Sequence, residues 1–308
     1  MEELVSPLGK LGKHRNKFMN DKNPLLGFIG QGFIGKNYAD DFAARGFSVV
    51  RYAKSAPYNE NRERIADCDI VFIAVPTPTT PTGFNYDTLK EVLALVGPGK
   101  SAVIKSTILP GTCEALQSLY PDRYVFHSPE FLTEKNAAHD AANPTRNIIG
   151  CPIENAEYRL RAEEIMNILP PSPLNLICSA KEAELIKYAS NSFLYLKVVH
   201  ANILYDLAAE VGADWQKIAA GVGADPRIGA SHLNPVHASG VTDKAGRGAG
   251  GHCFIKDFAA LREYLSLQGK DELGRRFLEA AEAKNLELLH SSGKDQDLVK
   301  GVYGEREG

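Results

Sequence analysis

The sequence predicts an α/β protein in which a doubly wound parallel sheet is followed by an all-helical domain with a long central helix. Short apolar runs alternate with helical patterns from about residue 25 to residue 178, and this alternation is typical of βαβ units. A glycine-rich turn directly follows the first apolar run. The segment 179–211 contains neither proline nor glycine, and it predicts one long helix.

The length of 308 residues is sufficient for two domains. We expect a polar leader over residues 1–23, a sheet domain over 24–178 and a helical domain over 179–308. The net charge of −3 gives no reason to expect nucleic acid as a partner. No apolar run approaches the roughly 18 residues that cross a membrane, and the leader lacks the apolar core of a secretion signal, so we expect no membrane partner.

The five cysteines are scattered along the chain and show no C-x-x-C spacing. This pattern argues against a disulfide framework and against a metal site. A reducing, cytoplasmic location is therefore expected.

Apolar runs and the residues that break them predict the elements of the sheet domain. Strands are expected at residues 25–30, 47–52, 69–75, 101–105, 123–127, 147–151 and 174–178. The third strand stops at Pro76 and Pro78, because proline cannot donate a ladder hydrogen bond. Helices are expected at residues 35–45, 86–95, 114–119 and 156–169.

The second half of the chain begins with the long helix. Ser179 followed by Glu182 is a capping box, which marks its first turn. Apolar residues lie on more than one side of the segment 179–211, as in helices buried between elements or between subunits. We expect a homodimer through this helix, and a central helix inside a monomer is the alternative. Further helices are expected at residues 215–221, 258–268 and 273–291, and the polar end of the chain is expected to fray.

The turn at residues 30–35 matches the pattern G-x-G-x-x-G between a strand and a helix. Gly30 permits the tight turn, Gly32 lets the backbone approach a pyrophosphate, and Gly35 permits close packing of the helix on the strand. The N-terminus of the helix then faces the anion. We interpret residues 24–178 as a Rossmann-type dinucleotide-binding domain; a turn without a ligand is the alternative.

The carboxylate that usually ends the second strand of such a domain is missing. That carboxylate bonds the 2′-hydroxyl of the adenosine ribose in NAD. Arg51, Lys54 and Ser55 stand in this region instead, and a cationic turn could accept a 2′-phosphate. NAD is the expected cofactor, with NADP as a possible second one; a solvated turn without a cofactor role is the alternative reading of Lys54.

A candidate nucleophile follows a pair of glycines. Gly250 and Gly251 allow the backbone before Cys253 to approach a substrate closely. Lys256 and Asp257 follow, and a nearby cation favours the thiolate form of the cysteine. The alternative for Cys253 is a buried packing residue.

Candidate polar groups lie elsewhere in the chain. Lys187 and Asn191 are four residues apart on the long helix, so they share a face and could stabilise an oxyanion. Glu130 and Glu134 have the same spacing and could transfer protons, or could cap and solvate a turn. Thr107 follows a buried strand at the edge where parallel sheets bind ligands, or it merely starts a turn.

Several segments in the same order and at similar spacing resemble the UDP-glucose/GDP-mannose dehydrogenase family, over about residues 25–265. They are residues 75–78 (VPTP), 106–112 (STILPGT), 128–134 (SPEFLTE) with Asp140, Pro144 and Arg146 after it, 187–193 (KYASNSF), 225–229 (DPRIG) and 250–257 (GGHCFIKD). The resemblance implies a sugar-nucleotide 6-dehydrogenase that oxidises a primary alcohol to a carboxylate in two steps. It implies that Cys253 forms a thiohemiacetal with the intermediate aldehyde and then a thioester that water hydrolyses.

The resemblance and the glycine turn together imply three sets of site residues. The catalytic set is Cys253, Lys187, Asn191, Asp257, Thr107, Glu130 and Glu134. The cofactor-binding set is Gly30, Gly32, Phe33, Ile34, Gly35, Lys54, Val75, Pro76, Thr77 and Thr107. The substrate-binding set is Glu130, Phe131, Leu132, Lys187, Asn191, Gly250, Lys256 and Arg227, the last acting in the site of the neighbouring subunit.

The sequence also departs from the family pattern. Lys135 replaces the usual glycine after Glu134, and Ala249 and Ile255 replace the commoner phenylalanine and proline. Family members continue into a second α/β domain that holds much of the nucleotide, whereas this chain has helical patterns after Asp257. Three expectations remain open: a smaller substrate, a separate partner domain, or nucleotide binding through the dimer mate.

Two other functions compete with the sugar-nucleotide dehydrogenase. One is a two-electron dehydrogenase of a small hydroxy acid, built on the same two-domain plan and using Lys187 and Asn191. The other is a non-catalytic nucleotide-binding subunit. The complete set of Cys253, Lys187, Asn191 and Asp257 argues for an enzyme.

Overall fold

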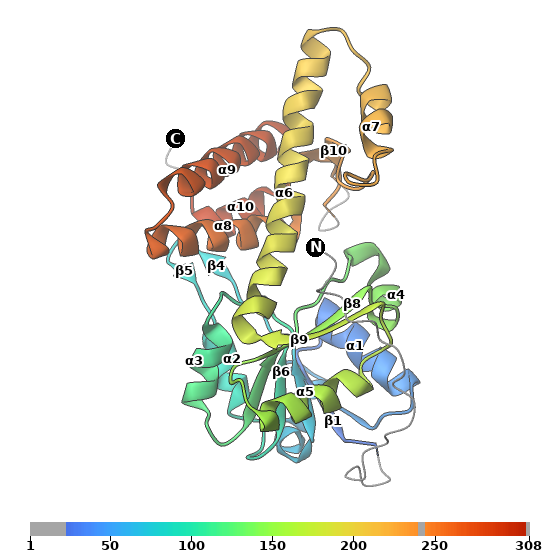
Figure 1. Cartoon of the computed structure of the whole chain (residues 1–308), viewed down its shortest axis with the longest axis vertical. Helices are drawn as coiled ribbons and strands as arrows, with labels where there is room; N and C mark the ends of the chain where they lie inside the picture. Colours follow the sequence, from blue (N-terminus) through green and yellow to red (C-terminus); the bar gives the residue numbers. More distant parts are fainter. Residues whose placement is uncertain (1–22, 240–243, 306–308) are drawn as a thin grey trace.

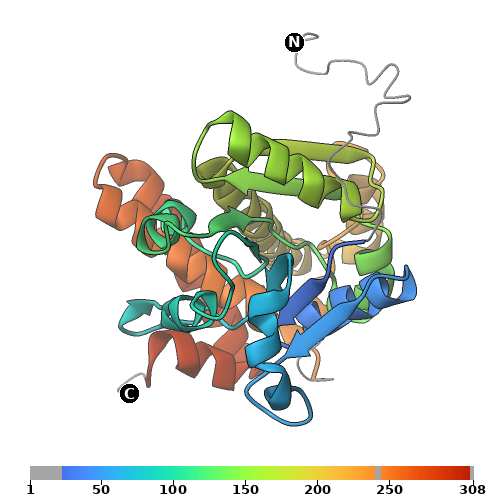
Figure 2. The ribbon, with the colours of Figure 1, turned by 90° about the horizontal axis from the view of Figure 1, so that it is seen from below.

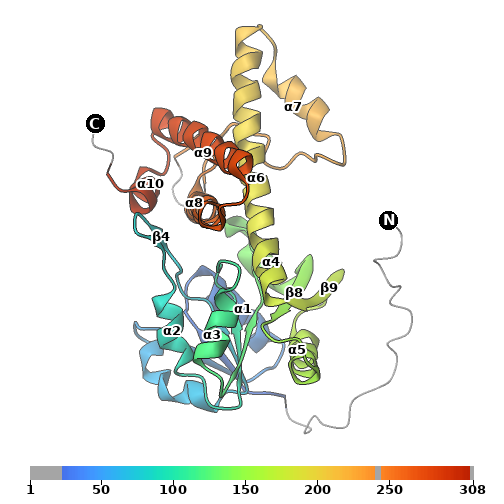
Figure 3. The same cartoon turned by 60° about the vertical axis from the view of Figure 1, so that its left-hand side comes forward.

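The computed structural model describes residues 23–239 and 244–305, which form a sheet region and a mainly helical region (Figure 1). The predicted leader lies outside the described residues apart from Asn23. The last sheet strand ends at Ser179, where the long helix α6 begins and rises away from the sheet (Figures 1 and 3).

Seven strands form the sheet in the order β2-β1-β3-β6-β7-β8-β9. Their bounds are β1 Leu26–Ile29, β2 Val49–Tyr52, β3 Ile70–Ile73, β6 Ser101–Ile104, β7 Tyr124–His127, β8 Arg146–Cys151 and β9 Leu174–Ser179. All neighbours are parallel except β7 and β8, which are antiparallel. The predicted, mostly parallel sheet is confirmed. The chain places β2 on one side of β1 and then returns to add β3 on the other side, so the direction in which strands are added reverses at β1. Open α/β sheets bind ligands at such a point, beyond the carboxyl ends of the strands.

Helices cover both faces of the sheet (Figure 2). One face carries α1 Phe33–Ala44, α4 Ala137–Ala142 and α5 Ala156–Ile168, and the other carries α2 Asp87–Leu93 and α3 Thr112–Leu119. Short 3₁₀ turns lie at η1 Tyr58–Asn61, η2 Glu63–Asp67 and η3 Glu134–Asn136, and a small ribbon pairs β4 Thr79–Thr80 with β5 Gly83–Phe84. Helix α4, the turns and the ribbon were not predicted, because they are too short to show a period.

The strands read as apolar runs because both of their faces are buried. Phe28 and Phe72 stack with ring centroids 5.1 Å apart and contact Phe42 of α1. Ile29 and Ile73, the next residues on the same strands, point into the core on the opposite face. The alternation of side chains along each strand thus supplies both layers of core.

Helix α6 spans Ala180–Glu210 and anchors the helical region to the sheet. The capping box is confirmed: Ser179 Oγ accepts from Glu182 N, and Glu182 accepts from Ser179 N at 2.8 Å. The buried Glu184 accepts hydrogen bonds from the N-terminus of α3, at Gly111 N (2.6 Å) and Cys113 N (2.8 Å). Burial raises the pKa of Glu184 to about 7 despite these bonds.

The helical region contains α7 Trp215–Gly223, α8 Gly251–Gln268, α9 Glu272–Ser292 and α10 Gln296–Tyr303. Helix α8 packs on α6, where Phe258 stacks on Tyr195 with centroids 3.8 Å apart. Three expectations are corrected. Helix α8 starts at Gly251 rather than at residue 258. Gln296–Tyr303, in the polar segment that was expected to fray, form α10. A short ribbon of β10 Val236–His237 and β11 Gly246–Arg247 interrupts the helices.

The described helices include none whose length and apolarity would suit a bilayer crossing. Helix α6 nevertheless exposes a second apolar face, opposite the one that packs on α8. Leu185, Phe193, Ile203 and Leu207 are all exposed and fall within a sector of about 80° at about 100° per residue.

Acid should destabilise the fold through His127, which is fully buried at the end of β7. Burial and the charge of Lys105 lower its pKa to about 3, and its Nδ1 lies 3.1 Å from the carbonyl oxygen of Ile104. The unfolded histidine takes up a proton near pH 6.5 while the folded one does not, so stability is lost as the pH falls from about 6.5 toward 3.

Urea unfolding between pH 7.5 and pH 5 measures this effect. We expect His127→Asn to reduce the slope of unfolding free energy against pH by about 1.4 kcal/mol per pH unit below pH 6.5. The exposed His200 gives the matched control, His200→Asn, which should leave the slope unchanged. Equal slopes in wild type and His127→Asn would contradict the prediction.

Candidate active site

Segments far apart in the sequence place charged and polar side chains around Cys253 at the carboxyl edge of the sheet. Glu130 follows β7, Lys187 and Asn191 lie on α6, and Lys256 and Asp257 lie with Cys253 in the first two turns of α8. The charges of Glu130, Lys187, Lys256 and Asp257 all act on the thiol of Cys253. The structure therefore brings together six of the predicted site residues.

Lys187 is a buried cation held at the carboxyl end of β7. Its side chain and that of Glu130 are each 5% exposed. Lys187 Nζ donates to the carbonyl oxygen of Glu130 at 2.7 Å and lies 3.3 Å from Glu130 Oε1. Glu130 Oε2 accepts from the backbone N–H of Leu132 at 2.7 Å. The ammonium keeps one N–H that could be directed at a substrate oxygen.

Asp257 connects α8 to α6. Its Oδ2 accepts from Asn191 Nδ2 at 2.6 Å, and its Oδ1 forms a short ion pair with Lys256 Nζ. Burial lowers the pKa of Lys256, but Asp257, Cys253 and Glu130 outweigh burial, so the net pKa is raised and Lys256 is a cation. Lys187 and Asn191 share one helix face, as their spacing predicts.

Cys253 is an exposed residue. Desolvation raises the pKa of its thiol to about 11, and Asp257 adds to the rise, while Lys187 and Lys256 lower the pKa by less. Both lysines favour the thiolate, as expected, but desolvation and the carboxylates of Asp257 and Glu130 outweigh them, so the net pKa of the thiol is raised. The thiol is neutral at pH 7, and it becomes the attacking nucleophile once it is deprotonated.

The loops after β3 and β6 are tied together beside this cluster. Thr77 Oγ1 donates to the carbonyl oxygen of Thr107 at 2.7 Å, and Ser106 Oγ donates to that of Val75 at 2.6 Å. The hydroxyl of Thr107 itself has no hydrogen bond to any described residue and is partly accessible. Thr107 thus has a hydroxyl available for a ligand at the predicted edge.

Two predicted site residues lie apart from the cluster. Glu134 is exposed in η3 and makes no hydrogen bond or ion pair with the residues that the structure describes. The side chain of Arg227 is 87% exposed and pairs with Asp225 at 2.6 Å, in a loop after α7 that receives hydrogen bonds from Lys197. Lys197 lies ten residues beyond Lys187 on α6, about 15 Å along the axis.

The glycine turn fits a dinucleotide. Gly30 has φ +88°, and a Cβ there would lie 2.3 Å from the carbonyl oxygen of Ala74; a Cβ on Gly35 would lie 1.9 Å from that of Gly30. A Cβ on Gly32 would meet nothing within 4 Å, so open space lies next to the backbone where a pyrophosphate would approach. The N-cap residue of α1 supplies no side-chain bond, which leaves backbone N–H groups for the anion.

The cations near the end of β2 already have partners. Arg51 pairs with Asp40 at 2.6 Å, and the exposed Lys54 pairs with Glu91 at 3.1 Å. Because both cations are paired with carboxylates, little positive charge is free to bind a 2′-phosphate. The structure therefore favours the use of NADP less than the sequence alone does.

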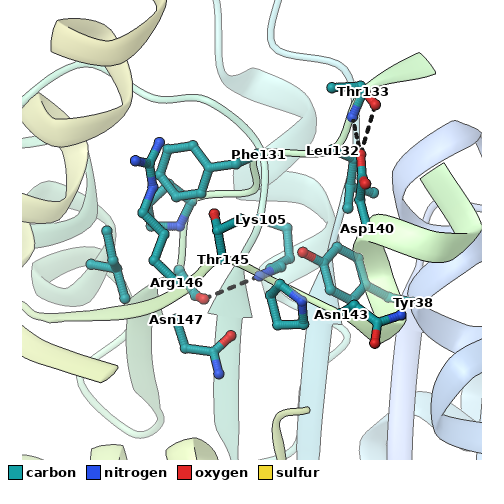
Figure 4. A pocket seen from close by; sticks show the side chains of 14 residues that line it. Tyr38, Lys105, Phe131, Leu132, Thr133, Asp140, Asn143, Thr145, Arg146 and Asn147 are labelled. Atoms are coloured by element: carbon teal, nitrogen blue, oxygen red, sulfur yellow. Dashed lines mark hydrogen bonds between the residues drawn. The ribbon is translucent and has the colours of Figure 1, made fainter. Parts of the chain in front are cut away.

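A pocket of about 180 Å³ lies behind the Phe131–Leu132 loop (Figure 4). The buried Lys105 donates to Ser128 Oγ at 3.1 Å and lies 4.4 Å from the centre of the Tyr38 ring, and burial lowers its pKa to about 8. Arg146 covers Phe131 with its guanidinium 3.7 Å from the ring centre. No role was predicted for Lys105 from the sequence. Its place at the end of the apolar run SAVIK could have indicated a lysine held at the carboxyl end of a buried strand.

Within the part of the chain that the structure describes, no group of three His, Cys, Asp or Glu side chains could hold a metal ion. The site is therefore made of a thiol, two ammonium groups, two carboxylates and an amide, next to a turn shaped for a pyrophosphate.

These features define a dinucleotide-binding α/β protein whose helical region supplies a cysteine to the carboxyl edge of the sheet. The chain belongs to the UDP-glucose/GDP-mannose dehydrogenase family. Residues 56–168 match the model of the family's NAD binding domain, and residues 181–287 match the model of its central domain. NAD is the cofactor of this family's binding domain. The glycine turn precedes the matched range, so its assignment rests on its own geometry.

Similar proteins include the UDP-glucose 6-dehydrogenase of Rickettsia bellii, which is 32% identical over 257 residues, 80% of this chain and 55% of that protein. The chain spans about half the length of the curated relatives it matches. A UDP-glucose dehydrogenase structure from Pyrobaculum islandicum has a TM-score of 0.73 at 27% identity, covering 86% of this chain and 68% of that one. The 3-hydroxyisobutyrate dehydrogenase of Mycobacterium tuberculosis shares the fold, with a TM-score of 0.68 at 18% identity, covering 92% of this chain and 99% of that one.

Proposed function

We propose that this chain is a sugar-nucleotide 6-dehydrogenase that oxidises a UDP-sugar primary alcohol to a carboxylate with NAD. The balanced reaction is R–CH2OH + 2 NAD⁺ + H2O → R–COO⁻ + 2 NADH + 3 H⁺. NAD, held by the glycine turn at residues 30–35, would supply the hydride acceptor for each of the two oxidations. The observation that supports this most is the exposed thiol of Cys253 beside Lys187, Lys256 and Asp257. Relatives named UDP-glucose 6-dehydrogenase support the choice of substrate.

In this proposal Lys187 and Asn191 hold the substrate oxygen where negative charge develops. Lys187 is fixed by Glu130 and Asn191 by Asp257, so their remaining N–H groups are oriented before the substrate arrives. Cys253 loses its proton and its sulfur bonds to the aldehyde carbon, which gives a thiohemiacetal. Loss of the second hydride leaves a thioester, whose C–S bond breaks when water adds.

Hydrolysis of the thioester needs an oriented water molecule. The free hydroxyl of Thr107 and the carboxylate of Asp257 are the groups we assign to hold and activate it, with Glu130 assisting. Lys256 would lie near the reacting carbon and offset the charge of Asp257. Glu134 retains a role only if its exposed turn moves toward the substrate.

The test is the number of NADH molecules formed per substrate consumed, measured with a panel of sugar nucleotides and hydroxy acids. We expect two NADH per UDP-sugar and a uronate as the product. One NADH per substrate, with Cys253→Ser fully active, would favour the two-electron hydroxy-acid dehydrogenase. The fold shared with 3-hydroxyisobutyrate dehydrogenase over nearly its whole length keeps that reading as the second candidate. No turnover of any substrate would indicate the non-catalytic nucleotide-binding subunit.

We expect NAD to be preferred over NADP, because Arg51 and Lys54 are already paired with carboxylates. The Michaelis constants of the two cofactors measure this preference. Glu91→Gln frees Lys54 and should lower the Michaelis constant for NADP severalfold, whereas Glu60→Gln, on the exposed η1 turn, is the control. A lower Michaelis constant for NADP than for NAD in the wild type would show that the cationic turn selects the 2′-phosphate.

We further propose a homodimer through the exposed apolar face of α6, with Arg227 contributing to the site of the partner subunit. This arrangement would place a guanidinium near the nucleotide of the neighbour, where it could bind phosphate. We propose a cytoplasmic setting for this assembly, as the scattered spacing of the five cysteines predicts.

We expect the wild type to have twice the 33.6 kDa mass of the chain by light scattering, and Phe193→Asp to have the mass of one chain. Phe193 is 68% exposed, more than the other three residues of this face, and Leu160→Asp, on an exposed position of α5, is the matched control. Equal amounts of the Cys253→Ser and Arg227→Ala variants, each inactive alone, should regain about a quarter of wild-type activity when they are mixed and allowed to exchange subunits. Half of the dimers then contain one subunit of each kind, and each such dimer has one of its two sites intact. A monomeric wild type, or no restoration, would refute the shared site.

A further inference from the structure

Side chains from the end of α9 and from the turn after it hold the backbone that leads to Cys253. We call residues 247–251 the cysteine approach. These side chains make six hydrogen bonds to its backbone. Ser292 Oγ accepts from Arg247 N (2.9 Å) and lies 3.4 Å from Arg247 O, and Lys294 Nζ donates to Gly248 O (2.9 Å). Asn285 bonds Ala249 N (2.6 Å) and Ala249 O (3.0 Å), and Asp295 Oδ2 accepts from Gly251 N (2.8 Å).

Asp295 acts as the cap of α8 from another part of the chain. The N-cap residue Gly250 has no side chain, so the first turn of α8 relies on the carboxylate of Asp295 at Gly251 N. The other oxygen of Asp295 accepts from Ser239 Oγ at 2.9 Å. A buried carboxylate at a helix N-terminus is favoured by the helix dipole. Asp295 itself has φ +52°, a left-handed conformation that non-glycine residues adopt only under constraint.

Lys294 holds the other side of the same backbone. It is fully buried, and its Nζ bonds Gly248 O and lies 3.1 Å from His237 Nε2 in the β10–β11 ribbon. Burial lowers its pKa to about 8, although Asp295 acts in the opposite direction. Burying an ammonium group is costly unless acceptors hold it, and here the two acceptors fix Lys294 against the backbone at Gly248.

The Lys294–Asp295 turn packs so closely against the cysteine approach that no side chain fits at position 250. A Cβ on Gly250 would lie 2.1 Å from Asp295 Oδ2 and 2.8 Å from Lys294 Cε. Helix α10 then covers α8 on the same side, as Figure 3 shows, with Val299 in one apolar cluster with Ile255. Ile255 is a position where the sequence departs from the commoner proline, and α10 supplies the cover for its larger side chain.

We propose that the Lys294–Asp295 turn, with α10 behind it, is a positioning element for Cys253. Both residues lie beyond residue 287, where the match to the family's central domain ends. Neither residue belongs to the predicted site sets, and both act through the backbone of the cysteine approach, which includes Gly250 of the predicted substrate-binding set. The catalytic part of this inference rests on the proposed function, whereas the placement of the thiol can be measured without turnover.

The test is the rate at which iodoacetamide labels Cys253 at pH 8 in the full chain, read by mass spectrometry. In Asp295→Ala the thiol is released from the surroundings that suppress its ionisation, so we expect labelling about tenfold faster or more. Asp297→Ala removes an exposed carboxylate two residues away and should change the rate less than roughly twofold. The kcat of Asp295→Ala should fall about tenfold with an unchanged Michaelis constant for NAD.

The buried Cys68, Cys113 and Cys151 report on global unfolding in the same experiment. Unchanged labelling of Cys253 in a folded Asp295→Ala variant would overturn the proposal. If the three buried cysteines become labelled, the Asp295→Ala variant is unfolded, and the milder variants Asp295→Asn and Lys294→Met are tested instead. In these variants we expect faster labelling of Cys253 and unchanged labelling of the three buried cysteines. A wild type without sugar-nucleotide turnover would refute the proposed function but leave the labelling comparison valid.

Discussion

Cys253→Ser should abolish the complete four-electron oxidation, with a loss of kcat on the order of 10⁴-fold. A serine hydroxyl at this position is a far weaker nucleophile than a thiol, because it gives up its proton much less readily. The variant has no sulfur with which to form the thiohemiacetal, and addition of the serine oxygen to the aldehyde is slow. The second oxidation therefore cannot proceed at a useful rate.

Rapid mixing with NAD and a UDP-sugar measures this loss, by following NADH and the oxidation state of the sugar. We expect the variant to release at most one NADH per sugar. Cys178→Ser is the matched control, because Cys178 is half-buried in β9, away from α8. A Cys253→Ser variant that still forms two NADH per sugar at the wild-type rate would refute covalent catalysis by this residue.

Lys187→Met should lower kcat by about 10²–10³-fold and also destabilise the fold. The substitution removes the N–H groups that we assign to the developing oxyanion, while the methionine keeps most of the buried stem. It also leaves the carboxylate of Glu130 buried without its cation, which costs about 3–5 kcal/mol in comparable buried pairs.

A second variant separates the two effects. The double variant Lys187→Met/Glu130→Gln no longer has an unpaired buried charge. We therefore expect it to regain most of the free energy of unfolding that Lys187→Met loses, while its kcat stays low. Urea unfolding and steady-state kinetics measure the two quantities. The exposed Lys181, one helical turn and a half earlier on α6, provides Lys181→Met as the control. Recovery of kcat in the double variant would show that Lys187 serves only the stability of Glu130.

Local rules explain why much of the fold could be predicted from the sequence. The glycine turn at residues 30–35, the capping box at Ser179 and the breaks at Pro76 and Pro78 each depend on bonds within a few residues. The apolar runs of β1, β3 and β6 show burial on both faces, which needs no knowledge of the neighbours. Lys187 and Asn191 share a helix face because of their spacing alone.

The errors occur where distant residues decide the structure. The helix in this part of the chain is expected from residue 258, yet α8 starts at Gly251, where Asp295, 44 residues later, caps it. Helix α10 was expected to fray, yet it packs on Ile255 and its neighbours. The antiparallel pairing of β7 with β8 also depends on how the chain crosses the sheet, which no local pattern records.

The sequence by itself determined the sheet with its glycine turn, the long capped helix and the identities of the polar residues around Cys253, because each follows from local periodicity or from a motif. Only the tertiary structure decided that Glu134 and Arg227 lie apart from that cluster and that the thiol of Cys253 is neutral. The physical reason is that ionisation and proximity depend on burial and on charges from β7, α6 and α8 together, and these meet only when the helical region packs against the sheet.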